Sequence, residues 1–369
     1  MNIFKLSRVT LAIFTIFIIC SFIANTGFAA SRTERQQVIS SINSVISKLN
    51  MGSISEEEAI KEITAIVPKP KNYPKRNIEF IIPWGEGGGS DRYARSIGRE
   101  AAKFLPKSLI FRNMPGASGE VGYAYVLTQP SDGYTLYGMV SPNIINDALG
   151  ETPYHFTEET TYIITNQGPS EVFWARSDDS RFNKWQDVVD YAKKNPGKLV
   201  ISASATKSDD EFMLVQLQEQ LGIKITHLAS NKSGQRQANL LGGHADLLHE
   251  SVGPVMDLYR GGKIKPILYN GSKRFAEIDP DVPCAKDVGL NLTIMRFRGI
   301  VGPPGIKEEI AEYLYYVFYA ASKMPEYKKF EKASSLQYSQ PWDLGLEDFE
   351  NLCKNFKKTA QGVIDKYYK

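Results

Sequence analysis

Apolar residues follow two different spacings along most of this chain, and the alternation of the two predicts an α/β protein. Short runs rich in β-branched and aromatic residues are typical of buried strands, and apolar positions three and four residues apart are typical of helices packed on one face. The predicted strands are 78–82, 108–112, 134–140, 171–176, 199–204, 223–228, 245–250, 264–269 and 296–301. The predicted helices include 185–194, 209–221, 235–241 and most of the C-terminal part. The first three strands alternate with helices, which predicts a mainly parallel sheet flanked by helices.

The first 30 residues have the layout of a secretory signal. Lys5 and Arg8 precede an apolar run at 11–23, and Gly27-Phe28-Ala29 supplies small residues for cleavage near Ala29 or Ala30. An uncleaved membrane anchor is the alternative interpretation. No later run approaches the roughly 20 apolar residues that a membrane span requires. We therefore expect a mature protein that is soluble outside the cytoplasm, and the resemblance described below places it in the periplasm.

Residues 31–75 form a polar extension ahead of the strands. Two segments carry apolar residues at helical spacing, and Ser55 with Glu58 has the pattern of a capping box at the start of the second. Pro68, Pro70 and Pro74 then indicate a linker. This pattern predicts a helical hairpin, with a mobile spacer as the alternative.

Charge and cysteine content narrow the function classes. Lys and Arg number 44 against 41 Asp and Glu, a net charge of +3, so neither nucleic acid nor an anionic membrane surface is an expected partner. The mature cysteines, Cys284 and Cys353, could pair, but they do not form a disulfide framework.

A glycine turn follows the first strand, in the sequence IIPWGEGGGSD. Pro83 ends the strand, and Gly85, Gly87, Gly88 and Gly89 let the backbone approach another molecule closely. Ser90 or Asp91 is the expected cap of the next helix, whose N-terminus is a binding site for a carboxylate or phosphate. A Walker A loop would need Lys before Ser or Thr, and a dinucleotide fingerprint would need glycine where Ser90 stands. We expect an anion cradle without a cofactor, and a turn without ligand is the alternative.

Two constellations that suggest catalysis or metal binding are weak. Ser204 and Lys207 match S-x-x-K, but Ser204 ends a predicted strand, whereas that mechanism places both residues on one helical turn. His244, Asp246, His249 and Glu250 resemble a metal cluster, but His244 and His249 are an odd number of residues apart on a predicted strand and face opposite ways. Neither a catalytic set nor a metal site is therefore expected.

The chain from about residue 77 onward resembles the substrate-binding receptors of tripartite tricarboxylate transporters, the TctC/Bug family. The stretches that carry the resemblance are IIPWGEGGGSD, FRNMPGASGEVGYAYV, QPSDGYTLYG, DVVDYAKKNPGKL, ANLLGGHADLL, DPDVPCAKDVGL and FRGIVGPPGI. They occur in the family's order and spacing and cover most of the mature chain.

The resemblance implies a two-lobed periplasmic-binding-protein fold of type II, the Venus flytrap. The first lobe would contain 76–173 and 296–369, and the second lobe 174–295, after the extension at 31–75. The implied function is a receptor, not an enzyme, that captures a small organic carboxylate between the lobes and delivers it to a membrane transporter. Such a protein is expected to be a monomer that docks transiently to the transporter subunits. A sensory receptor with the same clamp and a secreted α/β hydrolase are the alternatives.

The resemblance also places residues at the ligand. From the first lobe these are Trp84, Gly85, Glu86, Gly87, Gly88, Gly89, Ser90, Asp91, Ala117, Ser118, Gly119, Ser141 and Asn143. From the second lobe they are Ser204, Thr206, Lys207, Ser208, Lys232, Ser233 and Glu250.

Some of these positions depart from the family pattern. Trp84 either faces the ligand or packs in the core. Glu86 and Lys207 replace small or uncharged residues of the family. Glu86 either turns to solvent, pairs with Lys207 as a latch across the closed cleft, or binds a cationic group of the ligand.

Overall fold

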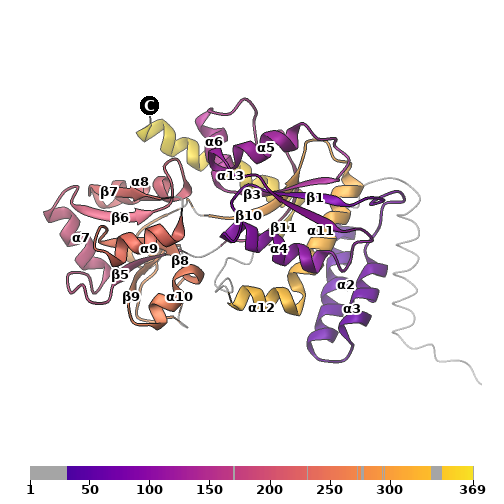
Figure 1. The fold of residues 1–369 in the computed structure, drawn as a ribbon, viewed down its shortest axis with the longest axis horizontal. Helices are drawn as coiled ribbons and strands as arrows, with labels where there is room; N and C mark the ends of the chain where they lie inside the picture. Colours follow the sequence, from indigo (N-terminus) through magenta and orange to yellow (C-terminus); the bar gives the residue numbers. More distant parts are fainter. Residues whose placement is uncertain are drawn as a thin grey trace, which may run out of the picture.

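The computed structural model describes residues 31–168, 171–230, 232–271, 273–275, 278–292, 294, 296–333 and 343–368. The predicted signal sequence at 1–30 lies outside the described residues. The described part of the chain contains two sheets that lie side by side, each covered by helices (Figure 1). We call the two halves the first lobe and the second lobe.

The sheet of the first lobe has the strand order β11-β4-β10-β3-β1-β2. Its strands are β1 (Ile78–Ile82), β2 (Leu109–Asn113), β3 (Thr135–Val140), β4 (Thr161–Gln167), β10 (Arg298–Gly302) and the two-residue β11 (Leu344–Gly345). β1 pairs in parallel with β2 and β3, as the βαβαβ order predicted. β10 pairs antiparallel with both β3 and β4, and β11 pairs antiparallel with β4.

The sheet of the second lobe has the order β7-β6-β8-β5-β9. Its strands are β5 (Glu171–Arg176), β6 (Leu199–Ala203), β7 (Ile225–Ala229), β8 (Leu247–Ser251) and β9 (Ile264–Tyr269). β6 is parallel to β7 and β8, whereas β5 is antiparallel to β8 and β9.

Both sheets are mixed but mainly parallel, as predicted: β1, β2, β3 and β4 share one direction in the first sheet, and β6, β7, β8 and β9 share one direction in the second. The reversed strands are β10 and β11 in the first sheet and β5 in the second. The chain passes from β4 in the first sheet to β5 in the second and returns from β9 to β10. Because β5 and β10 each enter their sheet from the side of the other lobe, they run opposite to the strands that end there. Glu171 at the start of β5 accordingly pairs with Ser251 at the end of β8, and Arg298 pairs with Val140 at the end of β3.

Helices cover the faces of both sheets. They are α4 (Gly89–Ala101), α5 (Glu120–Leu127), α6 (Pro142–Leu149), α7 (Trp185–Lys194), α8 (Asp209–Leu221), α9 (Ser233–Leu241), α10 (Val252–Arg260), α11 (Glu308–Lys323), α12 (Pro325–Ala333) and α13 (Leu346–Tyr367), with short 3₁₀ turns η1 (Ala117–Gly119) and η2 (Ala285–Val288). The predicted helices α7 and α8 are confirmed with their bounds, whereas β4, β11, α6 and α10 were not predicted. α11 is buried along most of its length against the first sheet and α4.

The extension at 31–75 is a docked helical hairpin. α2 (Arg32–Asn50) and α3 (Glu56–Ile66) both begin with capping boxes, and the predicted one at Ser55 and Glu58 is confirmed. Their apolar faces join the core of the first lobe, where Ile42 and Ile63 are fully buried. The hydroxyl of Tyr319 on α11 also donates a hydrogen bond to Asn43 at 3.0 Å. The hairpin therefore packs on the first lobe and does not form a separate spacer (Figure 1).

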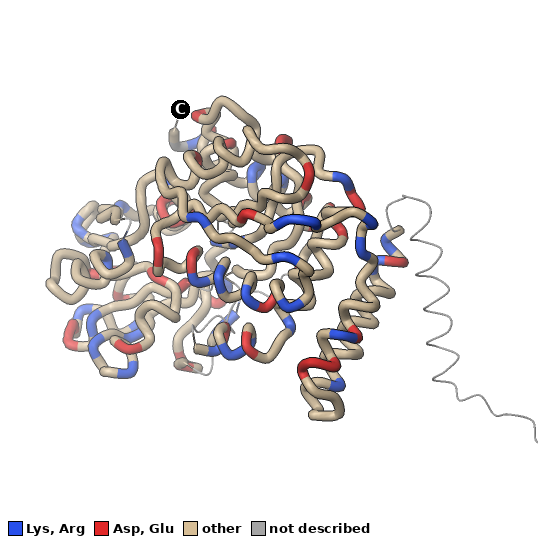
Figure 2. Tube along the Cα trace, turned by 45° about the vertical axis from the view of Figure 1, so that its right-hand side comes forward, with Lys and Arg blue, Asp and Glu red and all other residues tan. Residues whose placement is uncertain are grey.

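Surface charge is mixed over both lobes. Figure 2 shows acidic and basic residues interspersed along the chain trace, in keeping with the small net charge. Cys284 and Cys353 are both buried and free, so they do not pair. Within the described residues, no helix is long and apolar enough to cross a bilayer.

Candidate functional site

A cavity of about 190 Å³ lies between the lobes, where strand ends of the two sheets face each other. The first lobe contributes the glycine turn, the end of β4 and the start of β10, and the second lobe contributes the starts of α9 and α10. The lining residues are Gly87, Gly88, Gly89, Arg92, Gln167, Ser233, Arg236, Glu250, Ser251, Pro254, Arg296, Arg298 and Phe330. The ends of strands and the N-termini of helices thus meet here, where α/β proteins commonly bind ligands.

The glycine turn presents the N-terminus of α4 to this cavity. α4 begins after Gly88, which makes no side-chain cap. Ser90 and Asp91, the predicted caps, lie inside the first turn instead. The Asp91 carboxylate accepts hydrogen bonds from the Gly87 N–H at 2.9 Å and from Arg95 at 2.8 Å, and so holds the glycine turn against the first turn of α4. The first N–H groups of α4 have no partner within the helix and remain available to a ligand.

The side chain of Arg298 contacts the start of α4. Its Nε donates to the Ser90 hydroxyl at 3.3 Å, and its Nη1 donates to the side-chain oxygen of Gln167. A Cβ atom placed on Gly89 would lie 2.9 Å from Nη2 of Arg298. Glycine at position 89 is therefore what lets the guanidinium approach the backbone this closely.

The charged residues that the second lobe contributes to the cavity, Arg236 and Glu250, neutralise each other. Arg236 and Glu250 are 6% and 2% exposed and form an ion pair with each other. Glu250 also accepts hydrogen bonds from the Ser233 hydroxyl at 2.7 Å and from the Ser251 N–H at 3.1 Å. Arg236 donates to the carbonyl of Ser230 at 2.9 Å, while its Nε has no hydrogen-bond partner within the described part of the chain.

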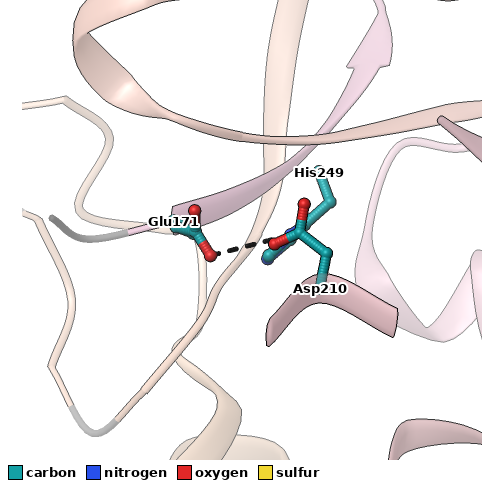
Figure 3. A group of neighbouring side chains, drawn as sticks. All are labelled: Glu171, Asp210 and His249. Carbon is teal, nitrogen blue, oxygen red and sulfur yellow. Dashed lines mark ion pairs between the residues drawn. The ribbon is translucent and has the colours of Figure 1, made fainter. Parts of the chain in front are cut away.

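A buried ionic network, which we call the hinge network, lies where the chain crosses between the lobes. Arg296, on the returning segment, pairs with Glu171 at 2.8 Å, with Asp209 at 2.9 Å and with Asp210 at 3.1 Å. His249 lies 3.2 Å from Asp210 and 3.8 Å from Glu171, and Figure 3 shows these three side chains pointing toward one another. The network contains three carboxylates for one guanidinium and one imidazole.

Burial and the neighbouring charges together shift the pKa values of the network. Burial raises the pKa of Glu171 to about 8, against the attraction of Arg296. Burial lowers the pKa of His249, but Asp210 and Glu171 outweigh it and leave that pKa above its usual value. Burial opposes ionisation of Asp210, yet Arg296 and His249 hold its pKa well below the usual range.

The network also bears on the metal cluster considered from the sequence. His249 does not meet His244 and Asp246, and its neighbours are Glu171 and Asp210, with one potential ligand atom of each within 4.8 Å of the others. Arg296 already places a positive charge against both carboxylates, so these groups are arranged as an ion-pair network.

Only some of the residues predicted to contact the ligand line the cavity. Those that do are Gly87, Gly88, Gly89, Ser233 and Glu250. Those that do not are Trp84, Gly85, Glu86, Ser90, Asp91, Ala117, Ser118, Gly119, Ser141, Asn143, Ser204, Thr206, Lys207, Ser208 and Lys232. Several of these serve the fold: Asn143 binds Tyr137, Glu120 and the Val140 backbone, and Ser208 caps α8.

Lys207 and Glu86 do not form the proposed latch. The Lys207 ammonium pairs at 2.6 Å with Glu151, a residue of the first lobe, so a salt bridge between the lobes exists with a different partner. Glu86 is exposed, which agrees with the solvent-facing alternative. Ser204 binds Ser208 and Arg296 through its hydroxyl, at 3.0 and 3.2 Å, so Ser204 and Lys207 are engaged apart from each other.

Sequence reasoning missed the arginines of the cavity, namely Arg92, Arg236, Arg296 and Arg298, and the neutral Gln167. A signal for Arg298 was present. It is a charged residue in the run FRGIVG, whose other members are apolar or glycine, and a cation in a buried strand needs a compensating partner.

The two lobes, the two crossings and the cavity between them define the class of two-lobed solute-binding proteins. Within that class, the family of tripartite tricarboxylate transporter family receptors, TctC, matches residues 93–367, and the chain belongs to this family. The match begins after the α2–α3 hairpin.

Named relatives are distant. A UPF0065 protein in the gbd 5′ region of Cupriavidus necator is 25% identical over 295 residues, which is 80% of this chain and 88% of that protein. The structure of MatC (Rpa3494) from Rhodopseudomonas palustris with bound malate has a TM-score of 0.66 at 21% identity, over 79% of this chain and all of that chain. The periplasmic binding protein BugD has a TM-score of 0.67 at 20% identity, over 80% of this chain and 98% of that chain. These likenesses confirm the predicted fold.

Proposed function

We propose that this protein is a periplasmic receptor that captures a small organic carboxylate in the cavity between its lobes and delivers it to a tripartite tricarboxylate transporter. The single observation that carries this proposal is the composition of the cavity. The N-terminus of α4 and the guanidinium of Arg298 meet there on one side, and both favour an anion.

Size and fold support the same class of ligand. A cavity of about 190 Å³ suits a small acid better than a peptide or a nucleotide. Malate is bound in MatC, a protein of the same fold, so a short dicarboxylate is the first ligand to test. The family is one of receptors, and the engaged state of Ser204 and Lys207 gives no support to catalysis at S-x-x-K.

A thermal-shift screen of the purified protein against di- and tricarboxylates, aromatic acids and amino acids tests the proposal, with titration calorimetry on every hit. A true ligand at 100 times its Kd should add about 2.7 kcal/mol to the free energy of unfolding. Absence of binding by every carboxylate, with an amino acid or neutral sugar bound instead, would refute the assignment. Small-angle scattering with the confirmed ligand then tests whether the lobes close.

A further inference from the structure

Two arginines lie two residues apart where the chain returns to the first lobe, and they differ in their ion pairing. Arg296 is paired with Glu171, Asp209 and Asp210. Arg298 has no carboxylate within ion-pair distance among the residues that the structure describes, and it donates hydrogen bonds to the neutral side chains of Ser90 and Gln167. Both arginines line the cavity, so one guanidinium there is neutralised and the other is not.

The surroundings of Arg298 also contain hydrogen-bond donors that lack an acceptor. Gln167 is 2% exposed, and because its oxygen accepts from Arg298, its amide nitrogen is left over. That nitrogen is buried and has no hydrogen-bond partner in the described part of the protein, although Gln167 lines the cavity. The free N–H groups at the start of α4 add further donors. Buried polar groups are normally paired, so this cluster of donors is incomplete without an acceptor.

The electrostatics agree with this geometry. Burial, and next the neighbouring charge of Arg296, lower the pKa of the Arg298 guanidinium to about 10, so its positive charge is held in an unfavourable place. The residue is nevertheless fully charged at neutral pH. An anion brought against it would be attracted and would relieve this cost.

From these contacts we infer that Arg298 is the anchor for one carboxylate group of the ligand and determines the requirement for negative charge at that end. The carboxylate accepts hydrogen bonds from the Arg298 guanidinium, from the Gln167 amide nitrogen and from the first amides of α4. This inference rests on the proposed function, because it concerns the same cavity. It adds an arginine to a site for which the resemblance named no arginine.

The first test removes the charge. Arg298→Met keeps a long apolar side chain, and Arg298→Lys keeps the charge without the planar fork. Affinity is measured by calorimetry for succinate, malate and the neutral succinamide, with Arg260→Gln, an exposed arginine at the end of α10, as the matched control. We expect Arg298→Met to lose at least about 100-fold in affinity for the carboxylates, Arg298→Lys to lose less, and the control to lose none.

Stability separates an anchor from a structural residue. Removing an unpaired buried cation should leave the melting temperature of the ligand-free Arg298→Met protein unchanged or raise it, whereas removing a structural ion pair would lower it. A variant that melts well below the wild type and has lost binding through misfolding would show a structural role and overturn the inference.

A second variant leaves the arginine in place. Gly89→Ala adds a methyl group that would meet the guanidinium at 2.9 Å, so it must displace Arg298, although alanine suits a helix better than glycine. Gly362→Ala on α13 is the control, because a Cβ there meets nothing within 4 Å. Gly89→Ala should weaken carboxylate binding while Gly362→Ala does not.

The outcomes distinguish this inference from the proposed function. If the wild-type protein binds no carboxylate, the proposed function fails. If the wild type binds succinate or malate and both Arg298→Met and Gly89→Ala bind with unchanged affinity, the receptor stands and the Arg298 anchor is refuted.

Discussion

The hinge network makes the stability of the protein depend on pH, and Glu171→Gln is the variant that exposes this dependence. Glutamine keeps the shape of the side chain and can still contact Arg296, but it does not titrate. In the wild type, the pKa of Glu171 rises from 4.5 to about 8 on folding because burial disfavours the charged form. The neighbouring charged groups are Asp209, Asp210, His249 and Arg296.

The sign follows from where the proton is held. The folded state keeps the Glu171 proton that the unfolded state loses above about pH 4.5, so stability falls as the pH rises toward 8. His249 acts in the same direction, because its folded pKa is raised: its contribution is present below about pH 6.5 and is lost through its folded pKa. Asp210, with a depressed pKa, matters only in acid.

The size of the stability loss depends on how much of the pKa shift of Glu171 falls within the pH range of the assay. Between pH 5.5 and pH 8, one group with a folded pKa of about 8 loses about 3 kcal/mol at 1.36 kcal/mol per unit. For a protein of this size that corresponds to roughly 4 °C in melting temperature. We therefore expect the wild type to melt several degrees lower at pH 8.5 than at pH 5.5, and Glu171→Gln to show a clearly flatter profile.

Differential scanning calorimetry from pH 5.5 to 8.5 measures both profiles. Glu57→Gln, an exposed glutamate on α3, is the matched control and should follow the wild type at every pH. If Glu171→Gln and the wild type give parallel profiles, Glu171 does not hold a proton in the folded protein, and the charge balance assigned to the hinge network is wrong.

Two smaller effects are expected at the cleft. The salt bridge between Glu151 and Lys207 joins the lobes, but both side chains are about half exposed. Glu151→Gln and Lys207→Met should therefore each weaken ligand affinity by no more than about fivefold, and their effects should be non-additive in a double-mutant cycle. Additive effects would show that the pair does not act as a latch. Arg92 lines the cavity from an exposed position, so Arg92→Gln should reduce carboxylate affinity only a few-fold and reduce its salt dependence, as calorimetry at low and high salt would show. A loss as large as that expected for Arg298→Met would contradict this ranking by burial.

The sequence predicts the elements of this fold better than its site, for a physical reason. Strands such as β5 and β9 and helices such as α7 and α8 follow from local apolar spacing, and the glycine turn follows from Pro83 and the glycines after it. Strand direction depends on where the chain re-enters a sheet, which no local pattern records, so the antiparallel β5 and β10 were missed.

The site is harder because its chemistry depends on pairing between distant residues. The polar side chains expected at a ligand include Ser141, Asn143 and Ser208. The side chains of Asn143 and Ser208, however, form hydrogen bonds within the protein, to Tyr137 and to the first turn of α8. Whether an arginine is neutralised depends on residues more than eighty positions away, such as Asp209 for Arg296. Sequence spacing cannot show which cation is left without a carboxylate.

The contrast between Arg296 and Arg298 links the hinge to the ligand. Phe297 between them is fully buried, whereas both arginines line the cavity. Within the described part of the chain, three carboxylates form ion pairs with Arg296 and none forms one with Arg298, although Glu171 and Asp209 are close enough to act on the pKa of Arg298. Because Arg296 engages the carboxylates that would otherwise repel an anion, the hinge network shields the cavity from negative charge. A ligand carboxylate at Arg298 then completes the balance of charge in the first lobe, and the same residue that costs stability in the free protein provides attraction in the complex.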